Sequence, residues 1–326
     1  MRISFNLINT GLNNNGGSLT LIESANILQE LGCDVTIVDG GKNLNMWNPI
    51  KCKHLIIKDL KDFPISDIVI ATGMGSLKST DELNISKKYH WIRGFEKWVT
   101  PEENIIKSMK NSKTKKIVNS ICLKRKLEKH GIQSEIIRPG HNFNDFKPLG
   151  LREKKQRVTI GGLFNQGTKR AQKRTEWIFD CYNFLKNKYD LSLIMFGADG
   201  IPNVDDNSIF IKNPEPNVKE KLYNMIDIWL SPSQLEGLHI APQEAMLTEC
   251  CVVGNNSEMS GTEDYLIDHE TGLVSENNFK SFLSNVEILV KHKVLRTELG
   301  KKGREKILSL GNREENMKRM IELLKD

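Results

Sequence analysis

The chain of 326 residues is 38% hydrophobic and 27% charged, a balance typical of folded proteins that excludes a largely disordered chain. No run approaches the roughly 18 uncharged apolar residues of a membrane-spanning helix. The polar run 9–17 would interrupt the core of a signal peptide, so we expect a protein of the cytoplasm. The length predicts two domains at about 150 residues each. Six cysteines without a C-x-x-C spacing indicate free, buried thiols.

The formal charge of +6 is unevenly distributed, because residues 1–148 carry +7 and the remainder carries −1. Much of the excess lies in a basic segment that contains Lys107, Lys110, Lys113, Lys115, Lys116, Lys124, Arg125, Lys126 and Lys129. This segment is either a solvated helix face or a surface for anionic lipid or a phosphate-bearing substrate. It contains no aromatic side chain on which a base could stack, so we expect no nucleic-acid partner.

The first half of the chain alternates predicted strands and helices. Residues 2–8 alternate apolar and polar side chains, as a strand does, and a turn is expected at Gly16 and Gly17. A helical pattern follows and stops at Gly32. Further strands are predicted at 35–38, 68–71 and 116–118. This rhythm favours a parallel sheet covered on both faces.

The rhythm restarts after the charged stretch 149–156, which we interpret as a linker. The patterns predict a helix at 175–185, a final helix at 312–324, and strands at 158–160, 191–196, 227–230 and 251–254. We therefore place the domains at 1–150 and 151–326, with the final helix, 312–326, able to pack back on the first domain. Such doubly wound domains bind ligands at the carboxyl ends of their strands.

Two phosphate-binding motifs are incomplete in this chain. The glycines between 11 and 17 do not form G-x-G-x-x-G, although Asp39 ends the second strand where a dinucleotide fold places its ribose-binding acid. The turn 162–169 ends in Thr-Lys rather than Lys-Thr, so it is not an NTPase loop, but it still suits a diphosphate. No H-x-x-x-H or D-x-D is present, and we expect no metal.

The most informative segment is 231–246, where Glu236 and Glu244 stand eight positions apart. The turn at 237–239 precedes a predicted helix, whose N-terminal N–H groups can bind an anion. Glu244 can accept hydrogen bonds from a vicinal diol such as a ribose, and Glu236 can face a second polyol. The alternative is two surface glutamates that flank an apolar helix.

This segment resembles the E-x7-E signature of retaining glycosyltransferases with the GT-B fold, in particular glycosyltransferase family 4. Residues 136–148, 222–230 and 252–274 resemble further segments of that family, in the same order. The resemblance implies an α/β protein of GT-B architecture, in which two Rossmann-like doubly wound domains face a central cleft. It covers most of residues 1–275.

The resemblance also implies roles for single residues. Glu236 would meet the transferred sugar, Glu244 the nucleotide ribose, and Lys173 the diphosphate leaving group, so that Glu236 and Lys173 are the implied catalytic residues. The remaining implied donor-binding residues are Gly237, Leu238 and His239 around the sugar and phosphate, Gly16 and Gly17 beside the diphosphate, and Gly197 beside the base.

The chain departs from the family pattern at two places. It has Gly161-Gly162-Leu163 where the family has Gly-Arg-Leu, so Lys169 or Arg170 would have to supply the missing cation. Leu238 and His239 replace a phenylalanine and a glycine, which leaves the donor sugar open.

The segment 90–98 resembles a W-I-R-G-Y-E segment found in a subset of these enzymes. There, Arg93, Glu96 and His90 would contact acceptor or donor, while Trp91 and Trp98 are expected to pack in the core.

The reaction implied is transfer of a sugar, with retention, from a nucleotide-diphosphate donor to a glycan or lipid-linked acceptor, without metal or cofactor. The enzyme would lie in the cytoplasm, at the inner face of the membrane if the basic segment binds anionic lipid. Two alternatives stay open: an inactive sugar- or nucleotide-binding module of the same fold, and a dinucleotide-dependent oxidoreductase that uses Asp39.

Overall fold

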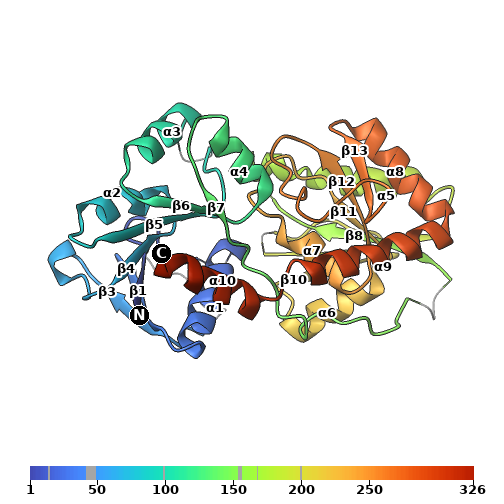
Figure 1. The fold of residues 1–326 in the computed structure, drawn as a ribbon. Coiled ribbons are helices and arrows are strands. Elements are labelled where there is room, and N and C mark those ends of the chain that lie inside the picture. Colours follow the sequence, from blue (N-terminus) through green and yellow to red (C-terminus); the bar gives the residue numbers. More distant parts are fainter. Residues whose placement is uncertain (14, 42–48, 98–99, 153–155, 167, 199) are drawn as a thin grey trace. The chain divides into compact units, whose positions relative to one another are not determined.

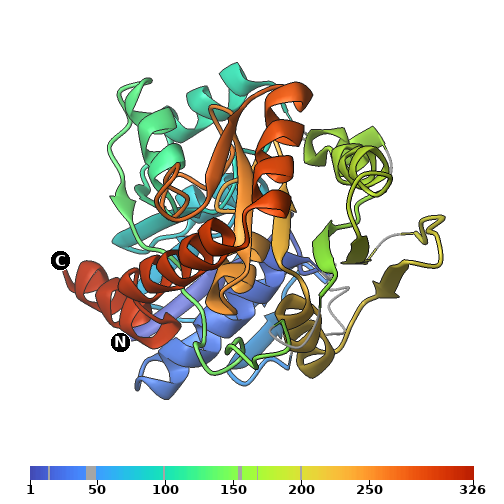
Figure 2. The ribbon, with the colours of Figure 1, turned by 90° about the vertical axis from the view of Figure 1, so that its right-hand side faces the viewer.

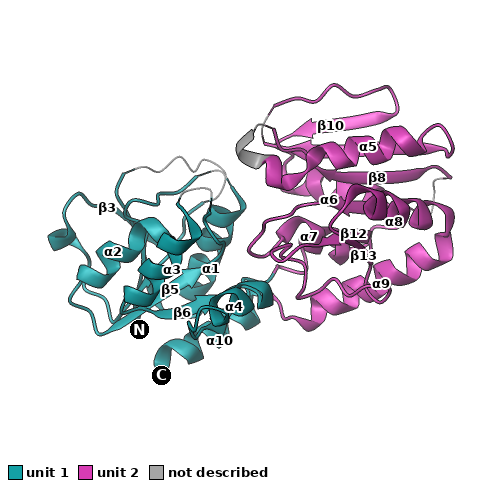
Figure 3. Ribbon diagram, turned by 90° about the horizontal axis from the view of Figure 1, so that it is seen from above, with its two compact units in different colours: residues 1–140, 313–326 teal, residues 141–312 magenta. Residues whose placement is uncertain are grey.

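The computed structural model describes residues 1–326 except 14, 42–48, 98–99, 153–155, 167 and 199; of 168–170 it describes only the backbone. The chain divides into two compact units (Figure 3). Unit 1 comprises Met1–Gly140 and Arg313–Asp326, and unit 2 comprises His141–Asn312. Each unit is a parallel sheet with helices packed on it, so the predicted α/β class with two Rossmann-like domains is confirmed.

Unit 1 has a seven-stranded sheet in the order β3-β2-β1-β4-β5-β6-β7. The strands are β1 (Arg2–Asn6), β2 (Asp34–Asp39), β3 (Lys53–Ile56), β4 (Ile68–Ala71), β5 (Lys87–Ile92), β6 (Lys115–Val118) and β7 (Glu135–Ile136). The helices are α1 (Gly16–Glu30), α2 (Met74–Glu82), α3 (Glu102–Asn111), α4 (Ile121–Glu128) and α10 (Arg313–Lys325). The strand order reverses between β1 and β4, where this kind of sheet opens to ligands.

The helices α1 and α10 come from opposite ends of the chain and lie side by side (Figures 1 and 2). Met317 and Met320 of α10 join Leu28 of α1 in one buried cluster with Phe5 and Trp91 of the sheet. The apolar stripe of the last helix therefore completes the core of unit 1. Its burial against α1 explains why the C-terminal residues belong to the N-terminal unit.

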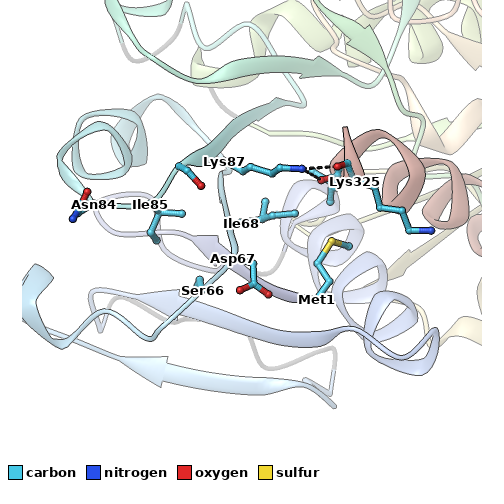
Figure 4. Close-up of a pocket in the computed structure, with 10 residues that line it drawn as sticks. Met1, Ser66, Asp67, Ile68, Asn84, Ile85, Lys87 and Lys325 are labelled. Carbon is cyan, nitrogen blue, oxygen red and sulfur yellow. Dashed lines mark hydrogen bonds between the residues drawn. The ribbon is translucent and has the colours of Figure 1, made fainter.

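A cavity of about 730 Å³ opens at the amino ends of β1, β4 and β5 (Figure 4). Lys87 lines it, and its ammonium group donates to the backbone oxygens of Lys325, at 2.5 Å, and Leu324, at 3.3 Å. These carbonyls end α10, where the helix dipole favours a cation. The ammonium group of Lys87 thus stabilises the last turn of α10. The cavity lies at the edge of the unit 1 sheet opposite the carboxyl ends of its strands.

Lys87→Met should lower the free energy of unfolding by about 0.3–1 kcal/mol, since it removes a cation from a helix C-terminus. Chemical denaturation measures this change. Lys78→Met is the matched control, because Lys78 is exposed and its ion pair is long: its ammonium group lies 3.9 Å from the Glu82 carboxylate. Equal stability of both variants would contradict the role given to Lys87.

Unit 2 has a six-stranded sheet in the order β10-β9-β8-β11-β12-β13. The strands are β8 (Val158–Leu163), β9 (Leu191–Gly197), β10 (Ser208–Lys212), β11 (Ile228–Ser231), β12 (Cys251–Asn256) and β13 (Leu273–Glu276). The helices are α5 (Thr175–Leu185), α6 (Pro216–Met225), α7 (Ile240–Leu247), α8 (Phe279–Lys291) and α9 (Lys293–Ser309). One apolar core packs α5 and α8 on the sheet, and a second packs α6 and α7 on it.

The division between the units falls at Gly140–His141, ahead of the stretch 149–156 interpreted as a linker. The described part of that stretch is bonded to unit 2. The Leu149 N–H donates to Asn224 Oδ1 at 2.7 Å, and Arg152 Nη2 donates to the backbone oxygen of Tyr223 at 2.6 Å. The charged stretch was interpreted as a linker, but the guanidinium of Arg152 donates to carbonyls at the end of α6 and so belongs to unit 2.

Three further expectations can be compared with the structure. Gly16 and Gly17 do not form a turn; they are the first residues of α1, whose N-cap Asn15 accepts from the Ser18 N–H. All six cysteines are free and buried, as predicted. Among the described residues, no helix is both long and apolar enough to span a bilayer.

Candidate functional site on unit 2

The carboxyl edge of the unit 2 sheet brings three of the predicted residues together. The 3-10 helix η2 (Thr168–Lys173), which follows β8, carries Lys173, and the loop after β11 carries Glu236 and His239. Lys173 Nζ donates to Glu236 Oε1 at 2.5 Å, and His239 Nε2 lies 3.6 Å from the same oxygen. The strand order reverses between β8 and β11, so the cluster lies where doubly wound sheets bind ligands.

The electrostatics favour an ionised Glu236 and a neutral His239. Burial raises the pKa of the Glu236 carboxyl, but the neighbouring His239 and Lys173 outweigh it and hold that pKa below its usual value. Burial, which outweighs the attraction of Glu236, lowers the pKa of His239 to about 4. At neutral pH the cluster therefore holds the Lys173–Glu236 ion pair beside an uncharged imidazole.

His239 is held at the start of α7 by both its ring and its backbone. Its Nδ1 is 2.9 Å from Ser231 Oγ, and its carbonyl accepts from Tyr265 OH at 2.7 Å and from Gln243 Nε2 at 3.1 Å. No side chain caps the N-terminus of α7, which leaves this helix end able to bind an anion. Leu238 is buried in the core under α6 and α7, so its side chain has a packing role.

Gly261 lets the loop after β12 approach Glu236 and His239 closely. Its φ is +68°, and a Cβ atom there would lie 2.6 Å from Glu236 Cβ and 2.9 Å from His239 N. The His239 N–H donates to the Gly261 carbonyl at 2.9 Å. This glycine therefore sets the position of both residues.

Glu244 lies within α7, and its two carboxylate oxygens have separate partners from α6. Lys219 Nζ donates to Oε1 at 3.0 Å, and Tyr223 OH donates to Oε2 at 2.7 Å. Glu244 is 7% exposed and Tyr223 is fully buried. Glu244 is thus buried, the side chain of Glu236 is only 12% exposed, and both are ion-paired, so they are not the surface glutamates of the alternative interpretation.

The other predicted donor-binding residues of unit 2 are described in part. A Cβ atom on Gly197 would lie 2.2 Å from the Phe164 carbonyl oxygen. The residue after β8 therefore approaches the end of β9 so closely that only glycine fits there. The side chains of Lys169 and Arg170 lie outside the described residues. The source of the cation expected from that turn stays a prediction. Gly237 lies on the loop between Glu236 and α7.

The predicted residues of unit 1 gather at the carboxyl edge of its own sheet. The guanidinium of Arg93 donates to the Gly17 carbonyl, and to the Thr72 carbonyl at 3.0 Å. Burial raises the pKa of Glu96, opposed by the Met74 backbone N–H and by Arg93. Residues predicted separately, at the start of α1 and after β5, therefore form one polar group around the carboxyl ends of β1, β4 and β5.

Two of the predicted side chains of unit 1 lie inside the fold. His90 is 1% exposed, and burial lowers its pKa to about 3. Trp91 is fully buried in the core, as expected, while Trp98 lies outside the described residues. Asp39 is also buried, and its carboxylate accepts from the Gly41 N–H at 2.6 Å and lies 2.5 Å from His54 Nε2.

The basic segment is less uniform than its sequence indicates. Lys116 and Lys126 are buried: Lys116 Nζ donates to the Thr114 carbonyl at 2.5 Å, and Lys126 Nζ is 2.6 Å from Glu102. These two lysines stabilise the packing of unit 1. The prediction of a surface that binds anionic lipid or a phosphate-bearing substrate therefore rests on the remaining basic residues of the segment.

Sequence reasoning missed four residues that shape the unit 2 site: Ser231, Gly261, Lys219 and Tyr223. A signal existed for the last two, because Lys219 and Tyr223 are spaced i and i+4 and so share one face of α6. Across the residues that the structure describes, no cluster of three or more His, Cys, Asp or Glu side chains is arranged to hold a metal ion.

Residues 202–306, within unit 2, match the family model of glycosyl transferases, group 1. A capsular polysaccharide biosynthesis glycosyltransferase, CapM of Staphylococcus aureus, is 26% identical in an alignment of length 129 that covers 36% of this chain and 33% of the relative. The chain thus spans about a third of the length of that curated relative.

Solved structures show the same fold over the whole chain. The sucrose-phosphate synthase of Thermosynechococcus elongatus matches with a TM-score of 0.80 at 15% identity, covering 100% of this chain and 98% of the other. HepE of Anabaena, in complex with UDP, matches with a TM-score of 0.81 at 11% identity, covering 100% of both chains. At these identities the likeness concerns the fold.

Proposed function

We propose, from the group 1 glycosyltransferase match and the site on the same unit, that the chain transfers a sugar from a nucleotide-diphosphate donor to a hydroxyl group. The observation that carries the proposal is the Lys173–Glu236 pair beside the uncapped N-terminus of α7. Lys173 and the N-terminus of α7 can bind a diphosphate, and the ionised carboxylate of Glu236 can bind the hydroxyl groups of a sugar. The capsular-polysaccharide relative and the UDP complex of HepE support a nucleotide donor and a glycan acceptor, while a lipid-linked acceptor stays a prediction.

The mechanism follows from where charge develops. As the bond to the anomeric carbon breaks, positive charge grows on the sugar and negative charge on the departing diphosphate. Lys173 and the N-terminus of α7 would stabilise the diphosphate, and the ionised Glu236 would bind sugar hydroxyls on the other side. We propose retention, which the family resemblance alone implies. We also propose independence from metal, which the resemblance implies and which the Lys173 ammonium group and the N-terminus of α7 support.

Lys173 is paired with Glu236, so a diphosphate bound at this ammonium group would compete with the carboxylate. Donor binding would then free the Glu236 carboxylate for the sugar. The pair thus neutralises both charges. One nucleotide sugar would contact both groups, with its diphosphate at Lys173 and its sugar at Glu236.

The proposal is tested by incubating the protein with UDP-, GDP- and ADP-sugars and glycan or lipid-linked acceptors in the presence of EDTA. We expect a glycosylated product by mass spectrometry, with the anomeric configuration of the donor by NMR. Nucleotide binding without turnover for any pair would instead favour the inactive binding module. A product that forms only after metal is restored would contradict metal independence.

A further inference from the structure

The carboxylate of Glu244 is held by two donors that the sequence signature does not contain. Lys219 and Tyr223 lie one helical turn apart on α6, and each reaches a different oxygen of Glu244 on α7, at 3.0 and 2.7 Å. An ionised carboxylate accepts about four hydrogen bonds. The two protein donors therefore leave about two acceptor positions, one on each oxygen. Two adjacent hydroxyl groups of a sugar ring present the matching pair of donors.

Tyr223 is rigid. Its ring packs edge-on against Phe146 and Phe196, with centroids 5.7 and 5.3 Å away, and lies 5.0 Å from the ring of Trp229. The side chain is fully buried, so the hydroxyl group has little freedom to move. Burial and the adjacent Glu244 raise the pKa of Tyr223 well above its ordinary value, so it is a donor throughout the physiological range.

Lys219 is held less tightly. Its ammonium group lies 5.1 Å from the centre of the Phe146 ring, as a cation–π contact, and its side chain is 23% exposed. Its ammonium group supplies the opposite charge that a buried carboxylate needs. Tyr223 thus fixes the direction of the Glu244 carboxylate, and Lys219 balances its charge.

We propose that Tyr223 and Lys219 are positioning residues that present the two remaining acceptor sites of Glu244 to the vicinal diol of a ribose. This inference rests on the proposed function and adds to it the two residues that hold the ribose-binding carboxylate in place. A 2′-deoxyribose lacks one donor of the pair and would leave one of the presented acceptor positions empty.

The test measures binding of UDP and 2′-deoxy-UDP by calorimetry. The wild-type protein should bind UDP about 10- to 100-fold more tightly, the ratio that corresponds to one hydrogen bond to a charged group. In Tyr223→Phe, whose ring keeps its packing, the ratio should fall to within about threefold. Lys219→Met should weaken UDP binding by about tenfold or more.

A matched control is Tyr189→Phe, because Tyr189 OH donates to Glu287 Oε1 at 2.8 Å elsewhere on unit 2. This variant loses a bond of the same kind and should keep the full ratio. Thermal denaturation of each variant separates loss of recognition from loss of folding, since a purely structural role would change stability and not the ratio.

Three results would overturn the inference. The first is an unchanged ratio in folded Tyr223→Phe, and the second is tighter UDP binding in Lys219→Met, which would place the ammonium group where the ribose binds. The third is a wild-type protein that binds UDP without preference over its deoxy analogue. A wild-type protein that binds no ribonucleoside diphosphate overturns the proposed function itself, and the inference falls with it.

Discussion

Lys173→Met should lower kcat of sugar transfer by 10²- to 10³-fold, or roughly 2.7–4 kcal/mol of activation free energy, the magnitude of losing one preorganised group that stabilises developing charge. The ammonium group of Lys173 lies at the carboxyl edge of the unit 2 sheet, as does the N-terminus of α7. Methionine keeps the length of the side chain and removes its charge. Steady-state kinetics with the donor identified by the transfer assay measures the loss.

The matched control for Lys173 is Lys186→Met, because Lys186 is 3.0 Å from Asp205 at the surface of the same unit. That variant should keep wild-type kcat. If Lys173→Met instead raised KM alone, Lys173 would bind the ground state and transition state equally, and its assignment to the leaving group would be wrong.

Gly261→Ala should destabilise unit 2 by about 2–5 kcal/mol and remove activity. Alanine at a φ of +68° costs roughly 1–2 kcal/mol, and overpacking adds about 1–3 kcal/mol. The new methyl group would contact Glu236 Cβ and the His239 backbone nitrogen, so it would also move both residues of the site. Chemical denaturation and the transfer assay measure the two effects.

Gly150→Ala separates the two costs, because Gly150 has a φ of +65° and no atom within 4 Å of its missing Cβ. It should show only the backbone cost and keep full activity. Equal destabilisation of both variants would mean that the close contact of Gly261 with Glu236 and His239 is unimportant.

The sequence predicted most of the inner strands, but it missed the inner strand β5 and the edge strands. The helix expected at 175–185 is α5 with the same limits, because its buried residues Ile178, Cys181, Tyr182 and Leu185 recur at helical spacing. The edge strands β3 and β10 were not predicted. Their side chains are mostly exposed or half-buried, so they lack the apolar run or strict alternation that marks an inner strand.

The candidate site could be predicted where spacing along the chain carries it. Glu236, His239 and Glu244 lie within nine residues, so the segment itself indicated a common site. Gly261 and Tyr223 reach the site from other elements, and a single sequence gives their type but not their proximity. The contact between Arg93 and Gly17 is of the same kind, because it depends on the order of β1, β4 and β5 in the sheet.

Thermal denaturation of the wild-type protein with UDP, GDP, dTDP, ADP and NAD tests the central claim most directly. A ligand at 100 times its Kd stabilises the folded state by about 2.7 kcal/mol, which gives a measurable rise in Tm. The account predicts a rise with at least one ribonucleoside diphosphate, lost in Glu244→Gln, and none with NAD. A rise with NAD alone, or with none of the five, would contradict it.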